Sequence, residues 1–247
     1  MPTLHLLGTG AAVSDAHRTT TMLACTTEDR TLVIDCGGDV VQRLLEAHIE
    51  LGSISGMIVT HEHPDHVSGF PLFVEKIWLA GRKKPIPVYG IRPALEQARR
   101  VFDAFDTSSW DVPEIRWNEV EMNESAAVLE DDLWRVTSSP GRHGVPVIGL
   151  RITAKGGGGT VAYSCDTEPS QPIRRLSEGA DILVHESTGE GMGHSSAEQA
   201  AEIARAAGAK RLILVHLPPG LSEGDLEAAR AIFEATELGE ELGTYTF

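Results

Sequence analysis

Short apolar runs alternate along this chain with longer segments in which apolar residues recur every three or four positions. Continuous apolar runs predict buried strands, and the longer period predicts amphipathic helices. The predicted strands cover residues 4–7, 22–26, 31–34, 54–59, 85–90, 136–139, 147–154, 160–164, 181–184 and 211–215. The predicted helices cover residues 40–49, 67–82, 93–105, 173–177, 197–207 and 222–237. Because strands and helices are interspersed, the pattern predicts an α/β fold.

The same order of elements occurs twice in the predicted pattern. A strand ends in Asp35, a helix follows, and the next strand ends in His61; the same order leads from Asp166 to His185. This predicts two similar halves, each a sheet with covering helices, that meet at a shared edge where polar strand ends gather. No low-complexity linker separates the halves, so we expect a single domain spanning residues 1–247.

Composition narrows the range of partners. The formal net charge is −15, and no basic patch stands out beyond Arg82-Lys83-Lys84. A protein that binds a long polyanion needs such a patch to release counterions, so we expect a small-molecule substrate rather than a long nucleic acid. The sequence leaves open whether the chain forms a homodimer.

Hydropathy and cysteine usage indicate a cytoplasmic protein. No apolar run approaches the ~20 residues that a membrane span requires, and the start of the chain lacks the basic and apolar segments of a signal peptide. Cys25, Cys36 and Cys165 lie far apart in apolar strand contexts. We therefore expect buried free thiols rather than a disulfide framework.

The strongest chemical signal follows the predicted strand 54–59, where the chain reads His61-Glu62-His63-Pro64-Asp65-His66. Neutral imidazole and carboxylate are ligands that borderline divalent metals prefer. The spacing splits into two pairs, His61 with His63 and Asp65 with His66, which predicts two cations. The alternative is a solvated polar turn, which leaves three imidazoles and a carboxylate in one short loop unexplained.

Other predicted strands also end in polar side chains that can complete this site. We expect the cation ligands to be His61, His63, His143 and Asp166 for one ion and Asp65, His66, Asp166 and His216 for the other. Asp166 has two oxygens and can bridge the ions, and Asp35 is suited to orient a ligand imidazole. Water held between two cations ionises near neutral pH and becomes a nucleophile. These nitrogen and oxygen donors favour two Zn²⁺ ions, and Mn²⁺ or iron remain open.

Taken in order, these residues resemble the metallo-β-lactamase superfamily and, within it, ribonuclease Z and its relatives. The motifs that carry the resemblance are Leu7-Gly8-Thr9-Gly10-Ala11-Ala12, His61-Glu62-His63-Pro64-Asp65-His66, His143-Gly144-Val145-Pro146, Gly149-Leu150-Arg151-Ile152, Ser164-Cys165-Asp166-Thr167, His185-Glu186-Ser187-Thr188, His194-Ser195-Ser196 and Leu214-Val215-His216. The resemblance implies a four-layer αβ/βα sandwich of two mixed β-sheets. It covers most of the chain from residue 4 to residue 217.

The resemblance also implies a metal-dependent phosphodiesterase in which Glu186 and His194 form an acid–base relay. A leaving alkoxide needs a proton, and a histidine steered by a carboxylate can supply it. We therefore expect Asp65, Glu186 and His194 to be catalytic residues. The alternative for His194 is a purely structural place in the turn before a helix.

Two departures from the ribonuclease Z pattern bear on the substrate. The tRNA-binding arm of that family lies between the third histidine and the bridging aspartate, where this chain has only residues 144–165 and a Gly156–Gly159 turn. His216 is followed by Leu217-Pro218-Pro219-Gly220 rather than a polar sequence. We therefore expect a di-zinc phosphodiesterase of small phosphodiesters, such as a cyclic nucleotide or short nucleotide. A ribonuclease Z-type endonuclease acting at tRNA 3′ ends is the first alternative, and a lactonase or other ester hydrolase is the second.

Overall fold

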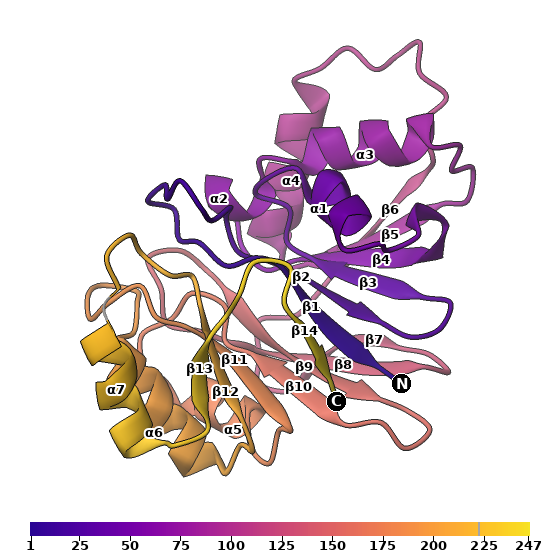
Figure 1. The fold of residues 1–247 in the computed structure, drawn as a ribbon. Coiled ribbons are helices and arrows are strands. Elements are labelled where there is room, and N and C mark those ends of the chain that lie inside the picture. The colour runs from indigo at the N-terminus through magenta and orange to yellow at the C-terminus, as the bar shows by residue number, and fades with distance from the viewer. Residues whose placement is uncertain (222) are drawn as a thin grey trace.

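Two mixed β-sheets face each other in the computed structural model, which describes residues 1–221 and 223–247 (Figure 1). Within these residues, the first sheet has the strand order β14 (Thr244–Thr246), β1 (Thr3–Gly8), β2 (Met22–Thr26), β3 (Thr31–Ile34), β4 (Ile54–Val59), β5 (Ile86–Gly90), β6 (Ile115–Glu119). The second has the order β13 (Thr236–Leu238), β12 (Leu212–Val215), β11 (Ile182–Glu186), β10 (Thr160–Tyr163), β9 (Ile148–Ala154), β8 (Trp134–Pro140), β7 (Ala126–Glu130).

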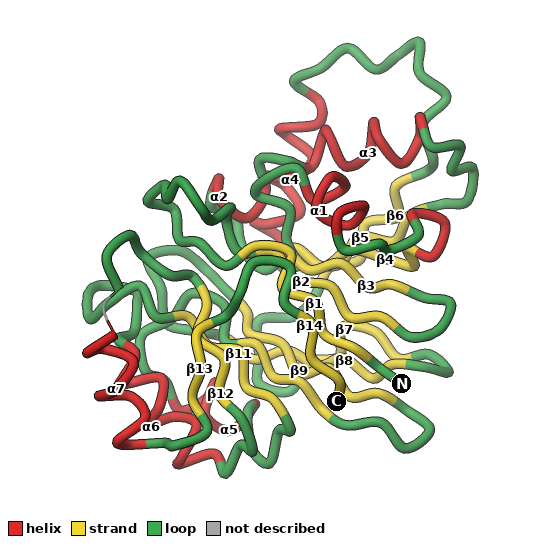
Figure 2. Tube along the Cα trace, in the orientation of Figure 1, coloured by secondary structure: helices red, strands yellow, loops and turns green. Residues whose placement is uncertain are grey.

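Helices cover the outer faces of both sheets, as Figure 2 shows by colour. On the first sheet lie α1 (Val40–Glu46), α2 (Pro64–Val67), α3 (Phe70–Leu79) and α4 (Arg92–Asp103), with the short 3₁₀ turn η1 (Leu51–Ser53). On the second lie α5 (Gln171–Leu176), α6 (Ala197–Ala207) and α7 (Glu223–Ile232). The main apolar core combines side chains of the two sheets, such as Leu6, Ile34, Val136 and Val161. The predicted four-layer αβ/βα sandwich is confirmed.

Parallel pairing brings the carboxyl ends of several strands to one edge. β3, β4 and β5 are parallel neighbours in the first sheet, and β10, β11 and β12 are parallel neighbours in the second. Because these strands run parallel, the polar residues that follow each of them gather at one side of the sandwich. Among the described residues, no helix has both the length and the apolar character needed to cross a membrane.

Elements with strong local signals lie where they are predicted. The β2–β3 hairpin pairs Leu23 with Ile34, and α6 begins with the predicted capping box between Ser196 and Gln199. Cys25, Cys36 and Cys165 are buried free thiols, as expected.

The helix predicted over 40–49 ends at Glu46, and two further helix predictions are wrong in their bounds. The helix expected over 67–82 is two helices, α2 and α3, separated at Ser68 and Gly69. The helix expected over 222–237 covers only Glu223–Ile232 in α7 and is followed by β13; its predicted first residue, Ser222, lies outside the described residues. The last strands, β13 and β14, were not predicted, because each has only three residues and depends on pairing with a distant strand.

Candidate active site

Residues 60–63 connect the end of β4 to α2, which begins with Pro64 at its first position and contains Asp65 and His66; residues 60–66 together are called the 60–66 loop below. His61 and His66 are fully buried. The loop packs tightly against the segment that follows β3: Cys36 N–H donates to the His66 carbonyl, and Gly69 N–H donates to the Cys36 carbonyl. A β-carbon on Gly37 would lie 1.6 Å from the Asp65 carbonyl oxygen, so only glycine permits this approach.

All the predicted metal ligands converge at this edge of the sandwich, and they fall into two groups. Ligand atoms of each group lie within 4.8 Å of one another: His61, His63, His143 and Asp166 in the first, and Asp65, His66, Asp166 and His216 in the second. Asp166 belongs to both. Its Oδ2 is 3.9 Å from the Nε2 atoms of His61 and His143 and 3.4 Å from Nε2 of His216, and its Oδ1 is 3.5 Å from Nε2 of His66.

Several of these atoms are suited to a cation because they lack any other partner. Among the described residues, the buried His61 Nε2, His66 Nε2 and Asp166 Oδ1 make no hydrogen bond. Buried polar atoms are normally satisfied, and unpaired lone pairs that face one another favour a positively charged ligand. The donor set therefore fits divalent metal ions.

His66, His143 and His216 each make a contact with another residue of the chain through the ring nitrogen Nδ1. His66 Nδ1 donates to Asp35 Oδ2 at 2.9 Å, as expected for an orienting carboxylate, and His143 Nδ1 donates to the Gly193 carbonyl at 2.7 Å. His216 Nδ1 is 2.6 Å from Thr188 Oγ1. These contacts leave the Nε2 atoms facing the centre of the site. The sequence interpretation identified Asp35 but missed Thr188 and Gly193, whose roles depend on contacts between distant segments.

Buried charges in the cluster are strongly coupled. Burial lowers the pKa of His61 well below its ordinary value, and the neighbouring His66 lowers it further. Burial also acts to lower the pKa of His66, but the Asp166 and Asp35 carboxylates outweigh it and raise that pKa well above its usual range. Burial acts to raise the pKa of Asp166, but His216 and His66 outweigh it and hold that pKa well below its usual range. The site thus keeps its carboxylates ionised and attracts positive charge.

Glu186 and His194 lie together beside the second group of donors. Glu186 is fully buried, and its Oε1 accepts hydrogen bonds from the Ser195 backbone at 2.8 Å and from His194 Nδ1 at 3.2 Å. The hydrogen bond to Glu186 raises the pKa of His194, against the effect of burial. The His194 ring stacks on the His216 ring with 5.5 Å between their centroids, which places His194 beside the second donor group.

Other histidines lie outside this arrangement. His185 is buried on β11, and its Nδ1 donates to the Glu186 carbonyl rather than to the donor groups. His48 is exposed and follows α1. His5 lies in β1, and its Nε2 is hydrogen-bonded to Thr26 Oγ1 in the neighbouring strand β2. Their exclusion from the predicted ligand set agrees with these positions.

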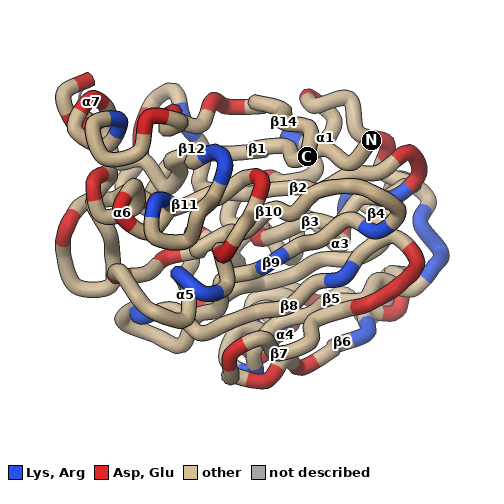
Figure 3. The backbone as a smooth tube through the Cα atoms, turned by 90° about the horizontal axis from the view of Figure 1, so that it is seen from below, with Lys and Arg blue, Asp and Glu red and all other residues tan. Residues whose placement is uncertain are grey.

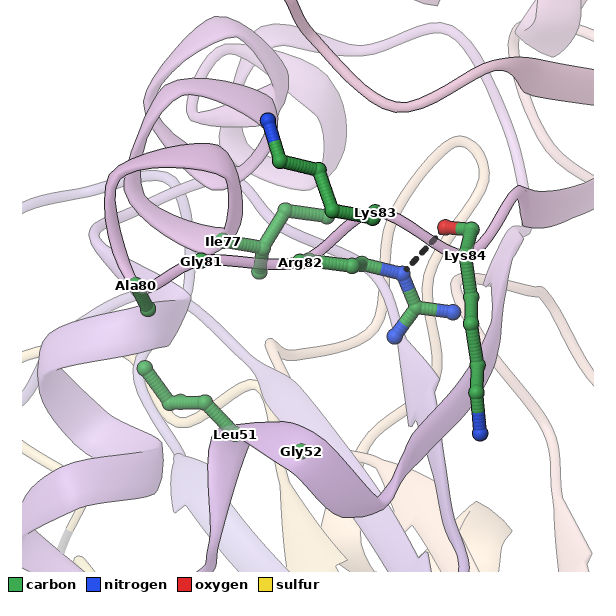
Figure 4. Close-up of a pocket in the computed structure, with 8 residues that line it drawn as sticks. All are labelled: Leu51, Gly52, Ile77, Ala80, Gly81, Arg82, Lys83 and Lys84. Atoms are coloured by element: carbon green, nitrogen blue, oxygen red, sulfur yellow. Dashed lines mark hydrogen bonds between the residues drawn. The ribbon is translucent and has the colours of Figure 1, made fainter.

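A cavity of about 350 Å³ lies by the basic Arg82-Lys83-Lys84 segment, and none of the donor residues lines it (Figure 4). Arg82 Nη1 donates to the Ile54 carbonyl at the start of β4, whereas the 60–66 loop follows the other end of that strand. The Lys83 and Lys84 amino groups point in opposite directions, and Lys83 pairs with Asp111. The segment therefore does not form a converging anion site.

Comparison with known proteins matches this geometry to a family. Residues 30–217 match the model of the beta-lactamase superfamily domain. The chain is 30% identical to ribonuclease Z from Methanothermobacter thermautotrophicus, over 96% of this chain and 94% of that protein. The chain belongs to the metallo-β-lactamase superfamily. It is a ribonuclease Z-like hydrolase of that superfamily, whose fold implies divalent metal ions at the donor groups.

Solved structures share the fold. The metallo-β-lactamase fold protein YhfI from Bacillus subtilis superposes with a TM-score of 0.83 at 22% identity, covering 99% of this chain and 98% of that one. The short form of human tRNase Z superposes with a TM-score of 0.82 at 22% identity, also covering 99% and 98%. At this identity the similarity describes the architecture of this superfamily member and not its substrate.

Proposed function

We propose that this hydrolase is a di-metal phosphodiesterase that acts on a small phosphodiester, such as a cyclic nucleotide or short nucleotide. The observation that carries the proposal is the pair of donor groups sharing Asp166, with the Glu186–His194 pair beside them. Two cations a few ångströms apart suit the in-line displacement of a phosphodiester, which has an attacking and a leaving oxygen to stabilise.

In this proposal each cation has its own protein ligands. His61, His63 and His143 would hold one, Asp65, His66 and His216 would hold the other, and Asp166 would contribute to both groups. Zinc is favoured by the imidazole-rich first group. When bound, the cations supply Lewis-acid stabilisation of charge on the phosphoryl oxygens.

The residues of the chain supply the proton. When His194 is protonated, Nδ1 donates to Glu186 and Nε2 carries a second proton, which can pass to the leaving alkoxide and leave a neutral imidazole still hydrogen-bonded to Glu186. Glu186 is itself immobilised by backbone N–H groups of Thr167, Thr188 and Ser195, so it fixes the orientation of the imidazole. Asp65 Oδ2 lies 3.2 Å from Nε2 of His216, the histidine on which the His194 ring stacks.

Features of the chain outside the donor groups support a small substrate. β9 and β10 are joined by a tight turn over residues 155–159, which leaves no room for an inserted arm. The alignment with the Methanothermobacter ribonuclease Z runs over 294 residues, more than the 247 of the whole chain, so the relative has insertions that this chain lacks. In the view of Figure 3, basic residues are dispersed among acidic ones and form no continuous stripe.

A second candidate function is cleavage of precursor tRNA at its 3′ end. The identity to ribonuclease Z along nearly the whole chain favours it. The net charge of −15 opposes it, because phosphate contacts by lysine and arginine dominate the affinity for long nucleic acids.

A substrate panel, run on one sample of measured metal content, tests the proposal. The panel contains bis-p-nitrophenyl phosphate, cyclic and linear dinucleotides, a carboxylic ester, a lactone and a precursor tRNA. We expect two cations per chain and turnover of the small phosphodiesters. Cleavage of the tRNA alone would establish the second candidate, and turnover of the esters alone would contradict both.

A further inference from the structure

Cys165 is a fully buried residue whose side chain has no part in the function proposed above. It follows β10 and directly precedes Asp166, and its backbone is in the left-handed region with a φ of 52°. Residues other than glycine rarely adopt this region, and when they do, they cluster at functional sites. Glycine would meet the backbone requirement without strain, so the cysteine side chain needs a separate explanation.

Two other residues at this edge share the same backbone conformation, and both use their side chains in the site. Asp35 has a φ of 61° and bonds to His66; His216 has a φ of 54° and belongs to the second donor group. Each of these residues follows a strand of the parallel part of its sheet. The left-handed turn therefore directs a side chain into the donor cluster at three strand ends, and Cys165 occupies the third.

The sulfur lies against the ring nitrogen of His61 that faces away from the proposed cations. Cys165 Sγ is 3.5 Å from His61 Nδ1, and its S–H donates to Thr60 Oγ1 at 3.0 Å. His61 Nδ1 is also 3.2 Å from Thr60 Oγ1. Since His61 Nε2 faces Asp166 and has no hydrogen-bond partner among the described residues, Nδ1 is the nitrogen that must carry the proton if Nε2 is to bind a metal.

We propose that Cys165 is a positioning residue for His61: its sulfur and Thr60 Oγ1 together accept the His61 Nδ1 proton and hold Nε2 toward the first cation. The inference rests on the proposed metal site, not on the identity of the substrate. His61 differs in this respect from His66, whose Nδ1 has a carboxylate acceptor.

The same contacts connect the two donor groups. Thr60 Oγ1 receives the S–H of Cys165 and donates to Asp35, which holds His66. A change at Cys165 therefore acts on His61 through a direct contact, whereas hydrogen bonds connect it to His66 through Thr60 and Asp35. A ring nitrogen of His66 also lies within 4.8 Å of the sulfur, but the described hydrogen bonds do not join the two. A substitution at Cys165 should therefore lower the cation affinity of the first donor group more than that of the second.

The test compares Cys165→Gly, Cys165→Ala and Cys165→Ser by measuring the affinities of both Co²⁺ ions in competition with a chromophoric chelator. Absorption spectra of the Co²⁺-loaded proteins and melting temperatures of the metal-free proteins are recorded alongside. Glycine and alanine should weaken one of the two sites about 10–100-fold and alter its Co²⁺ spectrum, as expected for loss of a partner of a ligand histidine. Serine retains an acceptor and should restore both readouts to near the wild-type values.

Glycine and alanine separate positioning from packing. Glycine relieves the left-handed backbone, so the metal-free Cys165→Gly protein should melt close to the wild type while its cation affinity falls. Cys25→Ala, a change of a buried cysteine in β2, is the matched control and should leave both affinities unchanged. Wild-type Co²⁺ affinities and spectra in both the glycine and the alanine variants would overturn the inference.

The outcomes separate this inference from the proposed function. A wild-type protein that binds two cations, binds one of them more weakly in Cys165→Ala and hydrolyses no phosphodiester would support the role of Cys165 and contradict the phosphodiesterase. Fewer than two cations in the wild type would overturn both.

Discussion

The carboxylate of Glu186 is buried. Among the described residues, His194 is the only titratable side chain hydrogen-bonded to this carboxylate. The other hydrogen bonds to its carboxylate come from backbone N–H groups, which fix its position. A rigid carboxylate against an otherwise half-exposed imidazole is an arrangement that controls a proton. A proton relay through this pair, as proposed, would distinguish a catalytic site from a site that only stores metal.

Replacing the imidazole tests that distinction. His194→Ala should lower kcat on the best phosphodiester by about 100-fold or more, since general acid catalysis typically contributes 10²–10⁴-fold. Metal content should remain at the wild-type level, because His194 is not among the proposed ligands. The measurement is steady-state kinetics with metal analysis of the same sample.

An exposed histidine provides the control for this substitution. His48 lies outside the site and has a φ of 57°, so His48→Asn, which tolerates the left-handed region, should leave kcat unchanged. Unchanged turnover in His194→Ala would remove the proposed acid.

The carboxylate partner should act through the pKa of the imidazole. The hydrogen bond to Glu186 raises the pKa of His194. Glu186→Gln removes the negative charge, so this pKa falls and the protonated fraction at a given alkaline pH decreases. Because the acid must be protonated, the alkaline limb of the kcat profile should move to lower pH. The comparison is a pH profile of kcat for both proteins.

Glu190→Gln makes the same chemical change at an exposed position of the same segment and should leave the profile unmoved. An alkaline limb at the wild-type pH in Glu186→Gln would show that the carboxylate does not control the proton.

At the scale of helices and strands, the predictions from the sequence agree with the structure where the residues that determine an element are close together in the chain. The β2–β3 hairpin and the capping box of α6 are encoded within a few neighbouring residues, and both were predicted with correct bounds. The break between α2 and α3 was missed because its cause is distant: a β-carbon on Gly69 would lie 2.0 Å from the Gly38 carbonyl. The strands β13 and β14 were missed for the same reason, since pairing with β12 and β1 creates them.

The contact between the segment after β3 and the 60–66 loop should be sensitive to a single methyl group. Gly37→Ala would place a β-carbon 1.6 Å from the Asp65 carbonyl, so the loop that carries the predicted ligands must move. We expect a loss of about 1–3 kcal/mol in the free energy of unfolding, the usual cost of overpacking. Cation affinity should fall as well, because Asp65 and His66 move with the loop. Urea denaturation and chelator competition measure the two effects.

Gly52→Ala is the matched control, since nothing lies within 4 Å of the β-carbon it would add. It should change neither quantity by more than a small fraction of the Gly37→Ala effect. Equal effects of the two substitutions would show that the close approach at Gly37 is unimportant for the site.

At the scale of the whole molecule, the donor groups depend on both halves of the sandwich. His61, His63, Asp65 and His66 follow a strand of the first sheet, whereas Asp166 and His216 follow strands of the second. The convergence could be predicted because polar residues after parallel strands meet at one edge. The contacts of Thr188, Gly193 and Cys165 with the ligand histidines could not, because they are set by how the segments pack and not by any local pattern.

Cations bound between the halves should therefore stabilise the folded chain as a unit. At a free concentration 100-fold above Kd, a ligand stabilises the native state by about 2.7 kcal/mol. For a chain of this size that corresponds to a melting temperature roughly 5–10 °C higher for each cation, and two cations together contribute about twice as much. Removing the metal with a chelator should lower the melting temperature by this amount, and restoring Zn²⁺ should reverse the change. Calorimetry of the metal-free and reloaded samples measures it.

The shape of the transition tests the prediction of one domain over residues 1–247. The apolar core joins side chains of both sheets, such as Leu6 from β1 and Val161 from β10, so neither half can unfold without exposing the other. Both samples should show one transition whose calorimetric and van't Hoff enthalpies agree. Two separate transitions, with only one of them dependent on Zn²⁺, would mean that the halves unfold independently and that the cations are held by one half alone.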